Sequence, residues 1–175
     1  MSFLSFPLRR FALFLALAAP FAAACGGKGG GAPALSPVPQ TAVLYDDDAG
    51  GLRDSVRVVV RDDAMLRALW RQATAGQDAP PPPPAVDWRR EMVVAVAAGR
   101  RAPSDRIRVD SVGMRREPGA DGKMRDAMAV LVRTTQGCER FTSAVFPVYL
   151  VRVRRYDGPV VFVERRDRSA GCAGG

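Results

Sequence analysis

The pattern of apolar and polar positions is clearest between residues 86 and 99. The segment begins with polar Asp87 and Arg89, is almost continuously apolar over residues 92–98, and ends at Gly99. A short apolar run bounded by charge and glycine is typical of a strand that is covered on both faces. We therefore expect the other elements to pack around this strand, with Val94 and Val96 in the core.

A strand and a short helix are predicted before this central strand. Residues 55–61 are rich in β-branched side chains, which favours a strand. Asp62 or Asp63 then offers a carboxylate that can cap a helix over residues 63–75, before Gly76. One apolar stripe follows from the spacing i, i+3, i+4 and i+7: Leu66, Leu69, Trp70 and Ala73. The pattern predicts that this stripe, Trp70 included, is core.

Further strands are predicted after the central one. Residues 106–112 alternate between polar and apolar, and residues 128–135 form a second strand pattern. Residues 147–155 and 160–165 read as a hairpin that turns at Asp157 and Gly158. The predicted fold class is α+β: a mainly antiparallel sheet of about five to six strands with one short helix packed on it.

Five prolines at residues 80–84 predict a stiff polyproline II segment. Its default interpretation is a spacer between the helix and the central strand. Recognition by a proline-binding domain is the alternative.

The first 24 residues have the three parts of a secretory signal peptide. Arg9 and Arg10 precede an apolar stretch at 11–19, and small residues follow. Ala22-Ala23-Ala24-Cys25 resembles the lipobox of bacterial lipoproteins, in which the cysteine is diacylated and becomes the mature N-terminus. The resemblance implies lipidation of Cys25 and export to the cell envelope, at the outer membrane in a Gram-negative cell. Ordinary cleavage near Ala24, which would release a free secreted protein, is the alternative.

The chain after Cys25 divides into a tether and one domain. Residues 25–51 are rich in Gly and Pro at the start and predict a flexible tether. Asp46, Asp47 and Asp48 lack the spacing of a calcium loop and are interpreted as a solvated acidic turn. Residues 52–175 are predicted to form the folded domain.

The charged residues exclude several functions. Lys plus Arg is 26 against 18 Asp plus Glu, which gives +8, but the arginines are spread along the strands and do not suggest a nucleic-acid patch. The chain has no His, which removes His-based catalysis and His metal sites. We predict no metal, no cofactor and no nucleic-acid partner.

Two cysteines remain once Cys25 carries lipid. Cys138 and Cys172 form an even pair, and in an exported protein such a pair favours a disulfide. A redox or nucleophilic role is the alternative, but neither residue lies in a Cys-x-x-Cys motif or has a His partner.

The assembled pattern resembles the C-terminal domain of the protease complex subunit PrcB family over residues 56–165. The residues that carry the resemblance are Leu69-Trp70, Val86-Asp87-Trp88, residues 91–96, Gly99-Arg100, residues 147–153 and Val161-Phe162. It implies a lipoprotein that binds and stabilises a surface protease without being one. Ser104-Asp105-Arg106 replaces a Gly-Gly-Tyr-like turn that is frequent in the family, which puts the function of that turn in doubt.

The leading functional hypothesis is a non-catalytic accessory lipoprotein that binds another exported protein, a peptidase being one such partner. Its membrane contact is the lipid anchor, and its partner surface is predicted at a sheet face or edge rimmed by Arg100, Arg152 and Arg154. One alternative is a small ligand held in an apolar pocket beside Trp70 and Trp88, which are otherwise core residues. The less favoured alternative is a hydrolase, for which the Asp87 and Glu91 carboxylates are the candidate pair.

Overall fold

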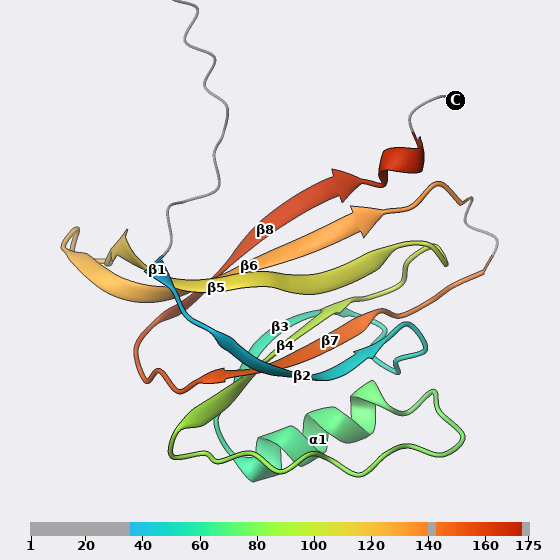
Figure 1. Ribbon diagram of the computed structural model, residues 1–175, viewed down its shortest axis with the longest axis horizontal. Helices are drawn as coiled ribbons and strands as arrows, with labels where there is room; N and C mark the ends of the chain where they lie inside the picture. Colours follow the sequence, from blue (N-terminus) through green and yellow to red (C-terminus); the bar gives the residue numbers. More distant parts are fainter. Residues whose placement is uncertain (1–35, 140–142, 173–175) are drawn as a thin grey trace, which may run out of the picture. The chain divides into compact units, whose positions relative to one another are not determined.

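The computed structural model describes residues 36–139 and 143–172 (Figure 1). Cys25 and the predicted signal peptide lie outside these residues. The described elements are β1 (Ser36–Pro37), β2 (Gln40–Asp47), β3 (Ser55–Val60), α1 (Asp63–Ala73), β4 (Glu91–Ala98), β5 (Arg106–Pro118), β6 (Met124–Gln136), β7 (Val148–Arg154), β8 (Val160–Arg168) and the 3₁₀ turn η1 (Ala170–Cys172).

The strands form two facing sheets, and α1 covers the outer face of one of them. One sheet has the order β1-β5-β6-β8 and the other β2-β7-β4-β3. All pairs are antiparallel except β6 with β8. Figure 1 shows the first sheet above the second, with α1 below both. The α+β prediction is confirmed, but the eight described strands make two sheets and not one sheet of five or six.

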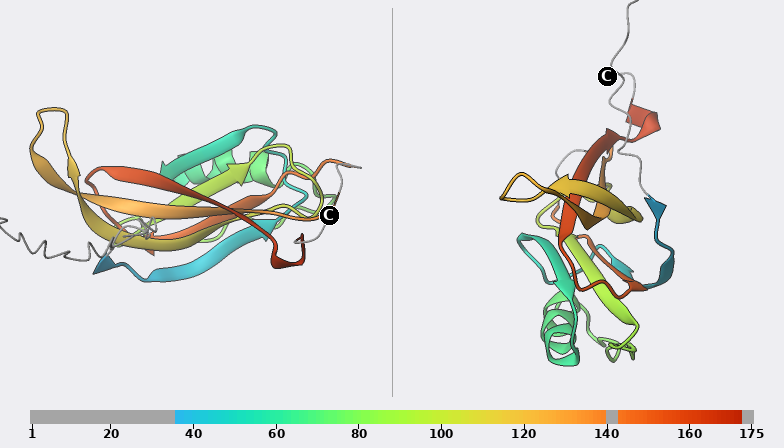
Figure 2. Two further views of the ribbon diagram at one scale, coloured as in Figure 1. Left: turned by 90° about the horizontal axis from the view of Figure 1, so that it is seen from above. Right: turned by 90° about the vertical axis from the view of Figure 1, so that its left-hand side faces the viewer.

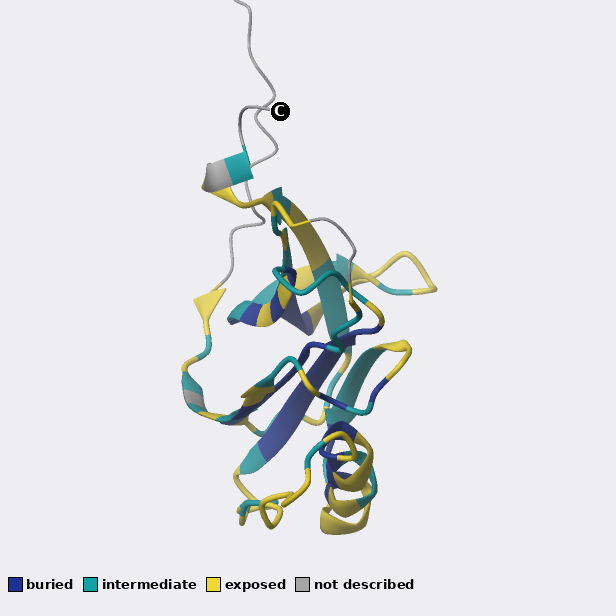
Figure 3. Ribbon diagram, turned by 90° about the vertical axis from the view of Figure 1, so that its right-hand side faces the viewer, coloured by how far each residue is buried: buried dark blue, intermediate teal, exposed yellow. Residues whose placement is uncertain are grey.

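Strand β4 is the buried centre, as its pattern predicts, because it lies between two apolar layers. One face carries Met92, Val94 and Val96 into a core shared with the opposite sheet. The other carries Val93 and Ala95 into a core shared with α1. Figure 3 shows the buried residues in dark blue in the middle of the molecule and the exposed side of α1 in yellow.

Helix α1 begins and packs as predicted. The carboxylate of Asp62 accepts a hydrogen bond from the Met65 amide at 2.8 Å, which caps the first turn. Leu66, Trp70 and Ala73 are buried. Leu69 and Trp88 are only partly buried, at the margin of the same core. The helix ends at Ala73, two residues before its predicted end.

The predicted tether contains the first two strands, so its boundary at residue 51 is wrong. Strand β1 pairs with β5 of one sheet, and β2, which follows it directly, pairs with β7 of the other sheet. The chain therefore crosses from one sheet to the other between β1 and β2 (Figure 2). The Val38 amide donates to Val112 O at 2.8 Å along this crossing. Asp46 and Asp47 belong to β2 rather than to a turn. Buried Tyr45 holds β2 in place, because its ring meets Trp70 edge-on with 5.3 Å between ring centroids.

The predicted C-terminal hairpin is also wrong. Strand β7 lies between β2 and β4, so it has no free edge for β8. The chain instead passes to the opposite sheet, where β8 runs parallel to β6. The predicted disulfide Cys138–Cys172 is confirmed. Because Gln136 at the end of β6 and Arg168 at the end of β8 are register partners, the disulfide joins the segments that follow these two parallel strands.

Candidate interaction surface

The two sheets are joined differently along their two sides. On one side the continuous chain of β1 and β2 crosses between them (Figure 2). On the other side the edge strands β3 and β8 face each other, and among residues 36–139 and 143–172 no strand pairs with the outer edge of either. We call this second side the seam.

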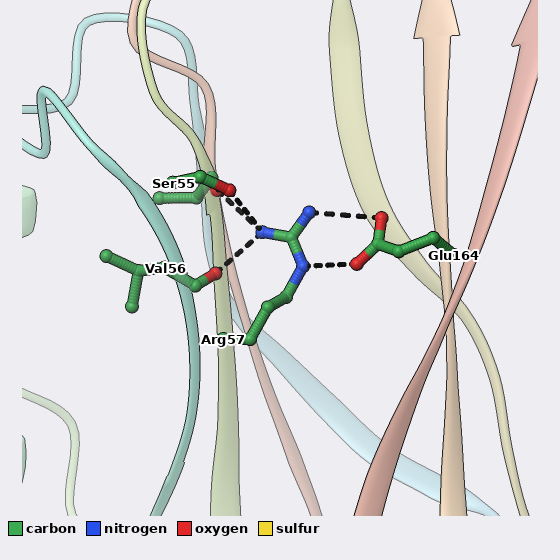
Figure 4. Close-up of polar contacts among 5 residues, drawn as sticks. Ser55, Val56, Arg57 and Glu164 are labelled. Atoms are coloured by element: carbon green, nitrogen blue, oxygen red, sulfur yellow. Dashed lines mark hydrogen bonds and ion pairs between the residues drawn. The ribbon is translucent and has the colours of Figure 1, made fainter.

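An ion pair bridges the seam between Arg57 of β3 and Glu164 of β8 (Figure 4). Nε of Arg57 lies 2.6 Å from Oε1 of Glu164, and Nη2 lies 3.2 Å from Oε2. Nη1 of the same guanidinium donates to the carbonyls of Val56 and Ala97, both at 2.7 Å. One arginine side chain therefore connects β3, β4 and β8, although its ion-pair partner lies 107 residues away in the sequence.

A second arginine reaches across the seam toward the loop before β8. Nη2 of Arg61 donates to the carbonyls of Tyr156 and Gly158, at 3.3 and 3.5 Å. Val59, Arg61, Pro159 and Val160 contribute to the lining of an open depression here. The seam is therefore closed by polar contacts over a partly exposed apolar margin and not by a strand.

Along the outer edge of β8, the backbone N–H and C=O groups have no partner strand among residues 36–139 and 143–172. The Met128 amide donates to Pro159 O, and the Ser169 amide donates to Gln136 O. With the parallel register, these bonds direct the backbone of odd-numbered β8 residues toward β6. The even-numbered residues, Phe162 and Arg166 among them, direct their N–H and C=O groups outward.

Charge is uneven along this edge. Residues 160–163 are apolar, and arginines follow in the second half of the strand. Arg165 pairs with Asp167 at 3.1 Å. Arg166 and Arg168 are exposed and have no ion-pair partner within the part of the chain that the structure describes. The edge is therefore extended, basic at one end and apolar at the other.

The three arginines predicted as a partner surface do not lie together. Arg154 is the register partner of Glu91 at the start of β4, whereas Arg100 follows the end of the same strand. Arg152 is only partly exposed, and its Nε lies 3.3 Å from Oε1 of Glu91. The predicted rim is therefore divided between opposite ends of β4.

The other predicted positions have local structural contacts. Trp70 is 5% exposed, and its indole N–H donates to Pro81 O at 2.7 Å, so its ring is covered and its polar group has a partner within the fold. Trp88 lies in an open turn over residues 86–90. There the Asp87 amide donates to Glu91 Oε2 at 3.3 Å. The two candidate hydrolase carboxylates thus take part in a turn.

The Ser104-Asp105-Arg106 turn holds three segments together. Oδ1 of Asp105 accepts from the Gly137 amide at 2.9 Å, and Oγ of Ser104 accepts from the Glu139 amide at 3.3 Å. Nη1 of Arg106 lies 2.9 Å from Oδ2 of Asp48. Burial raises the pKa of the Asp48 carboxyl above its ordinary value, while Arg106 opposes that shift. The turn thus has a structural role next to Cys138.

Sequence reasoning missed the seam. Val59 and Val160 look like ordinary strand residues, and neither Arg57 nor Glu164 belongs to a motif. Only the pairing of β8 with β6 makes β8 an edge strand, and no local signal encodes that pairing.

No family model, curated protein or solved structure matches this chain. Within residues 36–139 and 143–172, no helix combines the length and the hydropathy of a membrane span.

Proposed function

We propose that this chain is an exported, lipid-anchored accessory protein that binds another exported protein through the outer edge of β8. The observation that carries the proposal is the row of outward backbone groups on a nine-residue edge strand. An extended segment of a partner can add to such an edge by backbone hydrogen bonds.

The length and composition of β8 support this role. Proteins protect exposed edges by keeping them short, charged or interrupted by proline. The opposite edge of the same sheet is β1, which is two residues long. Strand β8 has four consecutive apolar residues before its charged half. It therefore has an unprotected portion that is long enough to pair with a partner strand.

The charge of the edge indicates the kind of segment that fits it. Arg166 and Arg168 would attract carboxylates, so the partner segment is expected to be extended and acidic at the end that meets them. The apolar half at residues 160–163 would meet apolar side chains. The resemblance to the PrcB family favours an exported protease as the owner of that segment, and a lipid on Cys25 would hold both proteins at the envelope.

Photo-cross-linking in cells tests the proposal. A benzoylphenylalanine at Arg166 is compared with one at Arg67, which lies on the exposed side of α1 and pairs with Asp63. We expect one exported protein to be cross-linked from position 166 and not from 67. Equal products from both positions would contradict a contact specific to the β8 edge. Recovery of the lipoprotein alone at 166 would contradict the proposal and favour a small ligand or a purely structural role.

A further inference from the structure

A second feature of the surface is the proline run at residues 80–84, in the loop between α1 and β4. Each of residues 79–83 precedes a proline, which excludes the helical region for it, and each proline fixes its own φ near −65°. The covalent structure therefore favours a polyproline II helix with three residues per turn. We call this part of the chain the polyproline segment.

The fold holds the polyproline segment against α1. The indole of Trp70, itself 5% exposed, donates to Pro81 O at 2.7 Å. Past the end of the segment, Nη1 of Arg152 donates to Ala85 O at 3.5 Å. Figure 1 shows the loop running back alongside α1 to the start of β4. The segment is thus fixed in position as well as in conformation.

Most of the held segment remains in contact with solvent. Pro84 is partly buried, whereas the four prolines before it, at residues 80–83, are exposed. Pro80 and Pro83 are one turn apart, so their rings lie on the same face about 9 Å from each other. This spacing is the one that aromatic-lined grooves bind in proline-rich ligands. A ligand that is already ordered loses little conformational entropy on binding.

The charge next to the segment indicates what surrounds such a groove. Arg89 and Arg154 are exposed and have no ion-pair partner among the described residues. Arg90 also follows the segment, with Nε 3.8 Å from Oδ2 of Asp87. The end of the segment near residue 85 is therefore positively charged, which fits a groove with an acidic rim.

We infer that the polyproline segment is a preformed docking ligand for a protein domain whose groove is lined by aromatic side chains and rimmed by carboxylates. A spacer between α1 and β4 would need no exposed face of this kind. The inference is independent of the β8 edge, which uses backbone groups on a different part of the domain.

A titration with a defined probe tests the inference. The probe is a purified SH3 domain with an acidic groove rim, and the reporter is a fluorescent dye attached beside its groove, because Trp70 and Trp88 of this chain would contribute to tryptophan fluorescence. The full mature chain is compared with a free peptide of residues 77–90. We expect the mature chain to bind at least as tightly as the peptide, because the fold orders the segment without covering it.

Variants locate the binding. The double substitution P80A/P83A should weaken binding at least tenfold, and R89E should weaken it several-fold, with a smaller effect at high salt. P159A is the matched control, since Pro159 is an exposed proline in the β7–β8 loop, and it should bind like the wild type. Binding by the peptide alone, by neither molecule, or equally by P80A/P83A would overturn the inference.

Discussion

The Arg57–Glu164 pair provides a quantitative test of how the seam is held. Glu164→Gln keeps the shape of the side chain but removes its charge, while Arg57→Met also removes the donor to Val56 O and Ala97 O. The pair is bidentate, at 2.6 and 3.2 Å. Its side chains are 21% and 39% exposed, so solvent screens the charges.

These features set the expected magnitudes. E164Q should lower the free energy of unfolding by about 0.5–1 kcal/mol, the upper range for a partly exposed ion pair. R57M should cost about 2 kcal/mol, because two carbonyls also lose a donor and the arginine stem loses its packing. In the double variant the loss should be smaller than the sum, with a coupling free energy of about 0.5–1 kcal/mol.

The assay is urea denaturation of the four proteins with the disulfide intact. It is run at low salt and again at about 0.5 M NaCl, which screens the charges. Urea is preferred because guanidinium chloride would itself screen the pair. The Asp63–Arg67 pair on α1 is the control and should couple by about 0.3–0.5 kcal/mol. Strict additivity of R57M and E164Q at low salt would refute the view that this pair bridges the two sheets.

Three further substitutions test the rest of the structure. Trp70→Phe removes the donor to Pro81 O but keeps an aromatic ring. It should lower the free energy of unfolding by about 1–2 kcal/mol in thermal unfolding and should speed proteolysis of residues 77–90. Unchanged cleavage would mean that the indole does not hold this loop. Serine at both Cys138 and Cys172 should cost about 3–4 kcal/mol for a separation of 34 residues, and the two chains should melt alike once the wild type is reduced. Because the pKa of Asp48 is raised in the folded protein, the folded state binds this proton more tightly than the unfolded chain does. The wild type should therefore lose stability relative to D48N as the pH rises from about 3 through the folded pKa. A difference in unfolding free energy that does not change with pH would contradict this sign.

The sequence alone was sufficient for elements whose signal is local. The apolar run of β4 predicts a strand buried on both faces, because neither face carries a polar residue between Met92 and Ala98. The stripe of α1 and the capping position before it follow in the same way from side-chain spacing. The pairing of Cys138 with Cys172 follows from the even count of cysteines after Cys25.

The features of the fold that the sequence does not predict depend on contacts between residues that are distant in the sequence. Alternation along β7 shows which residues face a core, but not that β2 and β4 occupy both of its edges. The predicted tether includes β2 because the acidic end of this strand has the composition of a loop, while buried Tyr45 gives the strand a place beside α1. The seam could not be predicted for the same reason, since Glu164 becomes the partner of Arg57 only after β8 has joined β6.

The most direct test of the proposed function compares Arg166→Pro with Arg166→Ala in binding to the protein that is cross-linked at this position. Both variants lose the charge, but only proline loses the N–H that points away from β6, so the β6–β8 ladder is kept in each. Isothermal titration should show affinity at least tenfold lower for R166P than for R166A. Equal affinities of the two variants, with unchanged folding, would contradict pairing of the partner with the β8 edge.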